Sequence, residues 1–149
     1  MIYTEMTKKA LKLAYEVHKD QVDKSGLPYV FHPFHLAEQM EDEISTVVAL
    51  LHDVVEDSKY TLADLEERGF SEPVIKSLDL LTHRSSDSYM EYIEKLSIDP
   101  VARKVKLADL EHNSDLSRLD KLTEKDRNRV EKYRKATLFL KNIDGGKNG

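Results

Sequence analysis

The sequence predicts an all-helical fold, a single bundle of about seven to eight helices. Apolar residues recur at the three-to-four-residue spacing of amphipathic helices along most of the 149 residues, and the alternating runs typical of strands are scarce. Only 5 Gly and 4 Pro interrupt the pattern, and the balance of 40% hydrophobic and 34% charged residues suits a helical domain with a charged surface. The length is that of one domain that can bury its own core.

The apolar spacing predicts helices, to within about three residues at each end, at 4–21, 33–42, 44–57, 61–68, 71–83, 87–96, 99–116 and 123–142. The first helix presents one apolar face, formed by Met6, Ala10, Leu13, Ala14 and Val17. The third is the most apolar and we expect it to be strongly buried, through Ile44, Val47, Val48, Leu51, Val54 and Val55.

Start and stop signals agree with these helices. A proline is tolerated in a first turn because its missing N–H would be unpaired there, and three prolines stand near helix starts: Pro33, Pro73 and Pro100. Thr61 with Asp64, and Thr123 with Asp126, resemble capping boxes with Asp in the usual Glu position. Gly69 fits a left-handed helix end.

No repeat or internal linker divides the chain, so we expect one domain over residues 1–142. Residues 20–31 form the one sizeable loop of the first half. Residues 143–149 are expected to be a frayed carboxyl-terminal tail.

Composition excludes several classes of protein. Cysteine is absent, which excludes thiolate zinc sites, disulfides and a cysteine nucleophile, and fits the cytoplasm that we expect as the location. The amino terminus has no signal-peptide pattern, and no run approaches the ~18 apolar residues of a membrane span. The net charge of -5 disfavours binding of duplex nucleic acid but leaves room for a small phosphorylated ligand, because a metal or a few lysines can supply positive charge locally. The sequence does not indicate an oligomeric state.

The segment His52-Asp53-Val54-Val55-Glu56-Asp57-Ser58 carries the clearest chemical signal. Residues four apart share one side of a helix, so His52 would lie above Glu56 and Asp53 above Asp57, beside an apolar face. Carboxylates this close repel one another unless a cation compensates, and the negative end of the helix dipole adds to the repulsion. Taken singly, Glu56 or Asp57 is better interpreted as a surface carboxylate. The four together favour a divalent metal site.

Two weaker signals come from other segments. Lys106, Asp109 and Asn113 share one helical face and could point into a common cavity, although a Lys–Asp pair three residues apart is more often a surface ion pair. His32 precedes Pro33 at a helix entrance, where a histidine is usually a loop or capping residue.

The order His32, His52-Asp53 and Asp109 resembles the metal-binding pattern of the HD-domain phosphohydrolases, which is histidine, histidine-aspartate, aspartate. More closely, the chain resembles the hydrolase domain of the Rel/SpoT stringent-response enzymes and the small stand-alone alarmone (ppGpp) hydrolases. The matching stretches are 21–33 (QVDKSGLPYVFHP), 49–58 (ALLHDVVEDS) and 105–113 (VKLADLEHN), in the family's order, and the likeness spans about residues 4–140.

The resemblance implies that one divalent ion, manganese in this family, is bound by His32, His52, Asp53 and Asp109. It also implies that Glu56 and Asp57 orient the attacking water and move its proton.

The resemblance further implies that Lys24, Ser25 and Asn113 contact the nucleotide or its phosphates. Lys106 matches a family lysine too, with a role in the site or in the structure.

Two positions depart from the family. Asp23 stands where an arginine usually precedes the loop lysine, and Asp115 stands where an arginine usually follows the asparagine, with Arg118 one turn later. Both exchanges reverse the sign of charge beside a polyanionic ligand, so they should weaken binding of a bis-pyrophosphorylated nucleotide in the family's pose.

The sequence therefore predicts a metal-dependent phosphohydrolase of a phosphorylated nucleotide, with the 3′-pyrophosphate bond of (p)ppGpp as the leading candidate. Another nucleotide or a phosphomonoester is the alternative within the class, and a non-catalytic nucleotide or metal sensor is the alternative outside it. A synthetase is disfavoured because 149 residues leave no room for a separate synthetase domain.

Four further histidines have no place in the ligand pattern: His18, His35, His83 and His112. His35 could reach the site, although a surface position or a contact to a ligand is the favoured interpretation. His18 is as compatible with a structural role as with a contact, and His112 is expected to be exposed. Tyr29 either approaches the substrate or packs beside Pro28.

Overall fold

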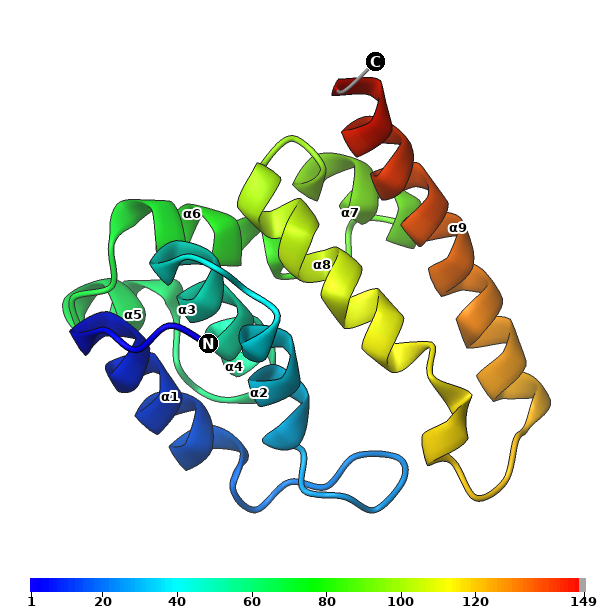
Figure 1. The fold of residues 1–149 in the computed structure, drawn as a ribbon, viewed down its shortest axis with the longest axis horizontal. Coiled ribbons are helices and arrows are strands. Elements are labelled where there is room, and N and C mark those ends of the chain that lie inside the picture. The colour runs from blue at the N-terminus through cyan, green and yellow to red at the C-terminus, as the bar shows by residue number, and fades with distance from the viewer. Residues whose placement is uncertain (148–149) are drawn as a thin grey trace.

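Helix α3 (Glu43–Leu51) is the central element of the fold. Every residue from Ser45 to Leu51 is buried, which is the pattern of a helix covered on all sides. Four helices pack around it, and Figure 1 shows them grouped about its position: α1 (Glu5–His18), α2 (Phe31–Glu38), α6 (Glu72–Leu81) and α8 (Pro100–Asn113).

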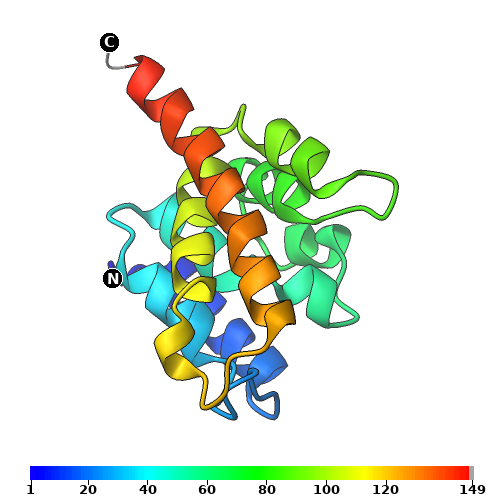
Figure 2. The ribbon, with the colours of Figure 1, turned by 90° about the vertical axis from the view of Figure 1, so that its right-hand side faces the viewer.

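The computed structural model describes residues 1–147, with side chains described to residue 143. The remaining elements are α4 (Val54–Asp57), α5 (Leu62–Glu67), α7 (Tyr89–Leu96), the 3-10 helix η1 (Leu116–Arg118) and α9 (Glu124–Lys147). Helix α9 packs on α8 and α7, and its carboxyl-terminal end extends past α8 (Figures 1 and 2). These residues hold no strand, only an isolated bridge between Val22 and Pro28, so the all-helical prediction is confirmed.

The predicted continuous helix at 44–57 is wrong. The structure divides it into α3 and α4, which is why residues 1–147 contain one α-helix more than the eight ranges predicted. His52 Nδ1 lies 2.7 Å from the carbonyl oxygen of Ala49. That carbonyl would otherwise accept the N–H of Asp53 in an uninterrupted helix, and a side chain that competes for it weakens the turn.

The helix signals correspond to observed caps. Thr61 and Asp64 form a reciprocal capping box, and Thr123 and Asp126 exchange the same pair of hydrogen bonds. Gly69 has a φ of 92°, the left-handed conformation expected there. Helix α2 begins at Phe31, two residues before the predicted start, so His32 lies in its first turn rather than ahead of it.

Helix α9 continues to Lys147, five residues beyond the predicted end at 142. Residues 148–149 of the predicted tail lie outside the described residues, and fraying from residue 143 stays a prediction. In the described part of the chain, no helix is both long enough and apolar enough to span a bilayer.

Candidate metal centre

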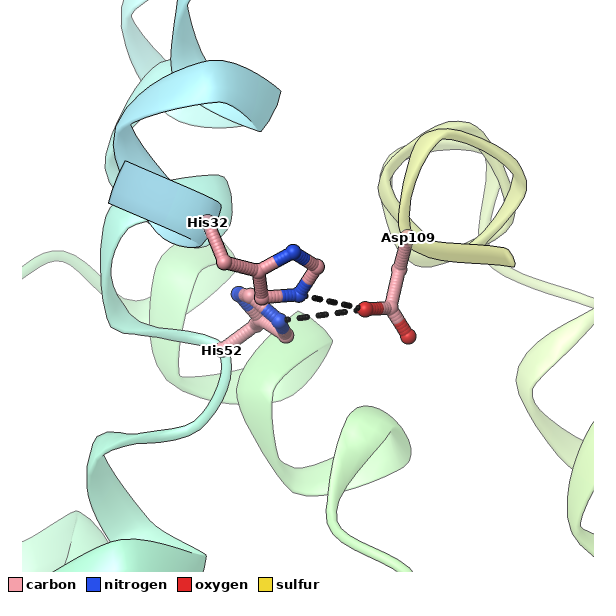
Figure 3. Close-up of side chains that lie close together, drawn as sticks. All are labelled: His32, His52 and Asp109. Atoms are coloured by element: carbon pink, nitrogen blue, oxygen red, sulfur yellow. Dashed lines mark hydrogen bonds and ion pairs between the residues drawn. The ribbon is translucent and has the colours of Figure 1, made fainter. Parts of the chain in front are cut away.

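Three buried side chains from three helices meet at the end of α3. His32 comes from the first turn of α2, His52 follows the last residue of α3, and Asp109 comes from α8 (Figure 3). Asp109 Oδ1 lies 2.8 Å from His32 Nε2 and 3.5 Å from His52 Nε2. Each residue offers one ligand atom, and the three atoms lie within 4.8 Å of one another. Two imidazole nitrogens and a carboxylate oxygen at this spacing can hold a divalent cation.

The tautomer of His52 makes this group suitable for a cation. A carbonyl oxygen only accepts, so the neutral ring carries its proton on Nδ1, which donates to Ala49, and Nε2 bears a lone pair. That lone pair faces Asp53 Oδ2 at 2.9 Å and Asp109 Oδ1 at 3.5 Å. Burial lowers the pKa of His52, but the two carboxylates outweigh it and hold that pKa well above its ordinary value. The same negative field favours a metal ion.

Asp53 stands beside the three-atom group rather than within it. The hydroxyl of Tyr29 donates to its Oδ2, so Tyr29 reaches the site through Asp53. Burial raises the pKa of Asp53, yet the neighbouring His52 outweighs it and lowers this pKa to about 2. Burial and the charge of Asp53 raise the pKa of Tyr29, so its hydroxyl keeps its proton. Asp53 is therefore a carboxylate with one oxygen held by a fixed donor.

Asp109 is held by two side chains of its own helix. Lys106 Nζ lies 2.9 Å from Oδ2, and Asn113 Nδ2 donates to Oδ1 at 3.0 Å. These contacts confirm that the three residues share one face of α8. Burial disfavours the charge on Asp109, but Lys106 outweighs it and holds the pKa of Asp109 well below its usual range.

Glu56 and Asp57 lie on α4 beyond the break, so they do not share one helix with His52. Both reach the surface, and Glu56 Oε1 accepts the backbone N–H of His83 at 2.7 Å. Partial burial and the carboxylates of Asp53 and Glu56 raise the pKa of Asp57 to about 6. A carboxylate with this pKa can take and release a proton near neutral pH.

Two cavities adjoin the metal group, each of about 300 Å³. We call the first the loop pocket. Its lining includes Lys24, Ser25, Asn113, Arg118, Arg129 and His32. We call the second the tyrosine pocket, and its lining includes Tyr89, Tyr92, Lys106, Lys132, Glu56, Asp53 and Asp109. Tyr29, Asn113 and Tyr133 line both. The metal ligands thus border two cavities that each contain cationic side chains.

The three predicted nucleotide contacts, Lys24, Ser25 and Asn113, lie together in the loop pocket. Arg129 and Tyr133 of α9 also line it, and the sequence did not single them out. Both residues lie far along the chain from every motif, so no local sequence pattern indicated that they line the pocket.

Asp23 organises the loop that carries Lys24 and Ser25. Its Oδ1 accepts the backbone N–H of Ser25 at 2.9 Å, the Ser25 hydroxyl at 2.6 Å and the N–H of Leu27 at 3.0 Å. Its Oδ2 pairs with Arg118 Nη1 at 3.3 Å. Asp115, the second departure from the family, caps η1 by accepting the N–H of Ser117 at 3.0 Å.

His112 is not exposed, contrary to the prediction. It is half-buried, its ring is nearly parallel to that of His32 with centroids 5.0 Å apart, and its Nδ1 lies 2.7 Å from His32 Nδ1. Burial and the nearby His32 and Arg118 lower the pKa of His112 to about 4, so the ring is neutral. Eighty positions separate the two histidines, and no local pattern indicates their contact.

Two further histidines, His35 and His18, lie near the site without joining the three-atom group. His35 is exposed, with its ring 4.3 Å from that of His112. His18 is fully buried, its Nδ1 lies 2.8 Å from Gln21 Oε1, and its ring lies 4.9 Å from that of Tyr29.

An all-helical domain that joins two histidines and an aspartate from three separate helices has the architecture of an HD-type metal-dependent hydrolase. No family model matches the chain. The chain does match individual proteins of known function. The chain is 32% identical over 119 residues to a guanosine-3′,5′-bis(diphosphate) 3′-pyrophosphohydrolase of Aquifex aeolicus, covering 72% of this chain and 17% of that protein. It is 32% identical over 120 residues to the bifunctional (p)ppGpp synthase/hydrolase SpoT of Escherichia coli, covering 71% and 17%.

A solved structure matches the fold over nearly the whole chain. It is a metazoan ortholog of SpoT that hydrolyzes ppGpp and plays a role in starvation responses. The TM-score is 0.75 at 26% identity, over 94% of this chain and 87% of the other. The chain is thus homologous to the Rel/SpoT enzymes, and the resemblance is confirmed. It spans less than a fifth of the length of the curated relatives named above.

Proposed function

We propose that this chain is a metal-dependent phosphohydrolase that acts on a phosphorylated nucleotide, with guanosine-3′,5′-bis(diphosphate) as the first candidate. The observation that carries the proposal is the buried group of His32, His52 and Asp109 between two cation-lined cavities. The relatives that act on this nucleotide supply the substrate class. Water would break the ester bond between the ribose 3′ oxygen and the pyrophosphate group, and the products would be GDP and pyrophosphate.

One divalent ion, manganese by resemblance, would be held by His32, His52, Asp109 and Asp53. Asp53 Oδ2 already lies 2.9 Å from His52 Nε2. Such an ion supplies Lewis acidity toward a phosphoryl oxygen and lowers the pKa of water. Tyr29 would orient Asp53, and Lys106 would hold Asp109 in its ionised form.

Glu56 and Asp57 would handle the proton of the attacking water. Glu56 lines the tyrosine pocket together with Asp53 and Asp109, and the His83 N–H orients its carboxylate. Asp57 lies one turn from Asp53 on α4, with a pKa of about 6 that suits a proton acceptor. A protein that only bound its ligand would have little use for two further carboxylates beside its metal, which favours an enzyme over a sensor.

Lys24, Ser25 and Asn113 would bind the nucleotide in the loop pocket, with Arg118 and Arg129 as further cations on its wall. The tyrosine pocket offers Lys106 and Lys132 on the other side of the metal group. A ligand with anionic groups at two positions, and the scissile bond between them, matches this distribution of charge. A nucleotide substrate and a chain without cysteine accord with a cytoplasmic location.

A manganese-dependent hydrolysis screen tests the proposal. Purified protein is incubated with guanosine tetraphosphate, other phosphorylated nucleotides and simple phosphomonoesters, with and without a chelator, and with Asp109→Asn as the inactive control. We expect pyrophosphate release from the tetraphosphate that needs Mn²⁺ and is lost in the variant. Turnover of a different ester would identify that ester as the substrate in place of the tetraphosphate. Binding of a nucleotide without any turnover would favour the alternative that the protein is a non-catalytic sensor.

A further inference from the structure

His32 has a defined partner at each nitrogen of its ring. Its Nε2 faces the metal group, 2.8 Å from Asp109 Oδ1, and its Nδ1 faces His112 Nδ1 at 2.7 Å. A neutral imidazole has one N–H and one lone pair, so the proton sits on only one of these two sides. A nitrogen that binds a metal must offer its lone pair, so His32 needs its proton on Nδ1.

His112 is the partner able to receive that proton in a hydrogen bond. Two nitrogens 2.7 Å apart make a hydrogen bond only when one donates and the other accepts. The rings are nearly parallel, with an interplanar angle of 8°, and they link the first turn of α2 to the last turn of α8.

The position of His112 is itself fixed by the loop pocket. Arg118 Nη2 donates to the backbone carbonyl of His112 at 3.0 Å, and Arg118 Nη1 pairs with Asp23 at 3.3 Å. The ring of His35 also lies near that of His112, with centroids 4.3 Å apart. A continuous series of contacts thus leads from the loop, through Arg118 and His112, to a metal ligand.

We propose that His112 is a positioning residue of the metal centre: its Nδ1 accepts the Nδ1–H of His32 and so turns the lone pair of His32 Nε2 toward the cation. The inference rests on the proposed metal site. It assigns to His112 no contact with the ion and no part in proton transfer to the substrate. Partners that orient a ligating histidine are worth about 10- to 100-fold in metal affinity.

Metal affinity of three variants tests the proposal. His112→Phe keeps a ring without an acceptor. His112→Asn can place its amide oxygen near the former Nδ1, whereas His112→Gln places it near the former Nε2. Isothermal titration with Mn²⁺ should show affinity about 10- to 100-fold weaker for Phe and Gln, and within a few-fold of wild type for Asn. His35→Phe is the matched control, since it also alters a ring beside His112, and it should leave the affinity unchanged.

A second measurement does not depend on affinity. In protein labelled with ¹⁵N and loaded with diamagnetic Mg²⁺ or Zn²⁺, the His32 Nδ1 should be protonated and coupled through the hydrogen bond to a bare His112 Nδ1. A proton on His112 Nδ1 instead, or wild-type affinity in both the Phe and Gln variants, overturns the proposal.

The design separates this inference from the proposed function. Circular dichroism checks the folding of each variant, and if His112→Phe is unfolded, the comparison of Asn with Gln decides alone. Wild-type protein that binds no divalent ion would end the metal-site proposal. In metal-loaded protein, a proton on His112 Nδ1 would refute its accepting role and leave the metal-site proposal intact.

Discussion

Arg118 and Asp23 are 95 positions apart and meet at the loop pocket, with Arg118 Nη1 3.3 Å from Asp23 Oδ2. The loop that carries Lys24 is thereby tied to the segment that follows α8. Asp23 stands where the Rel/SpoT family usually has arginine, and Arg118 lies beside it in space. The pocket therefore keeps an arginine, supplied from a different segment. The carboxylate of Asp23 is engaged by four donors, one of them Arg118, which reduces its repulsion of an anionic ligand.

The first prediction concerns this arginine. Replacing Arg118 by Met should raise the KM for a polyphosphorylated nucleotide by roughly 10-fold or more, because a charge-assisted hydrogen bond is worth about 1.5–3 kcal/mol. The kcat should change little, since Arg118 would bind the ground and transition states alike. Steady-state kinetics measure both values.

Arg134→Met is the matched control, because Arg134 is on α9 outside the lining of both pockets and pairs with Glu131. It should leave KM unchanged. Equal effects of the two variants would mean that Arg118 acts only through the net charge of the protein.

Much of the fold followed from local patterns, and the site followed only in part. The helices and caps are set by residues three or four apart, which a sequence displays directly. The break between α3 and α4 was missed because His52 competes for a carbonyl of its own helix, a choice stabilised by the site around it. The contact of His112 with His32 depends on how α8 packs against α2. The residues next to His32 and those next to His112 in the sequence do not reveal how these two helices pack.

The second prediction concerns the metal ligands. His52→Ala and Asp109→Asn should each abolish tight binding of about one Mn²⁺ per chain, because either change leaves two of the three clustered donor atoms. Elemental analysis after dialysis measures the stoichiometry. His83→Ala is the control, since His83 borders the tyrosine pocket but lies outside the three-atom group. Retained metal in both ligand variants would contradict the assignment.

The third prediction concerns proton transfer. Asp57→Asn should lower kcat by about 100-fold with metal binding intact, the usual size of a general-base contribution. The base must be ionised to accept a proton, so kcat/KM should fall as the pH drops through the pKa of Asp57. That pKa is about 6, and a nearby divalent ion would move it lower by favouring the carboxylate.

The pH profile distinguishes this role from a structural one. The acidic limb should disappear in Asp57→Asn and persist in Glu66→Gln, an exposed carboxylate on α5. An unchanged limb in Asp57→Asn would transfer the role to Glu56, whose own variant, Glu56→Gln, should then remove it.

The fourth prediction concerns stability. Leu50 is 1% exposed in the central helix, and Leu50→Ala should lower the free energy of unfolding by about 2–5 kcal/mol, through lost apolar burial and the cavity left behind. Leu138 is 49% exposed on α9, so Leu138→Ala should change it by less than about 0.5 kcal/mol. Chemical denaturation of the metal-free proteins gives both values. A small effect at Leu50 would contradict the central position of α3.

The fifth prediction concerns Lys106, whose ammonium lies 2.9 Å from the buried Asp109 carboxylate. In metal-free protein, Lys106→Met should cost about 3 kcal/mol of stability or more, because Asp109 loses its nearest counter-charge. A bound divalent ion supplies that charge instead and no longer meets the repulsion of Lys106. The rise in melting temperature on adding Mn²⁺ should therefore be larger in Lys106→Met than in wild type. Lys104→Met, on an exposed position of the same helix, should leave the rise unchanged. A smaller rise in Lys106→Met would mean that the lysine shapes the metal site itself rather than neutralising one of its ligands.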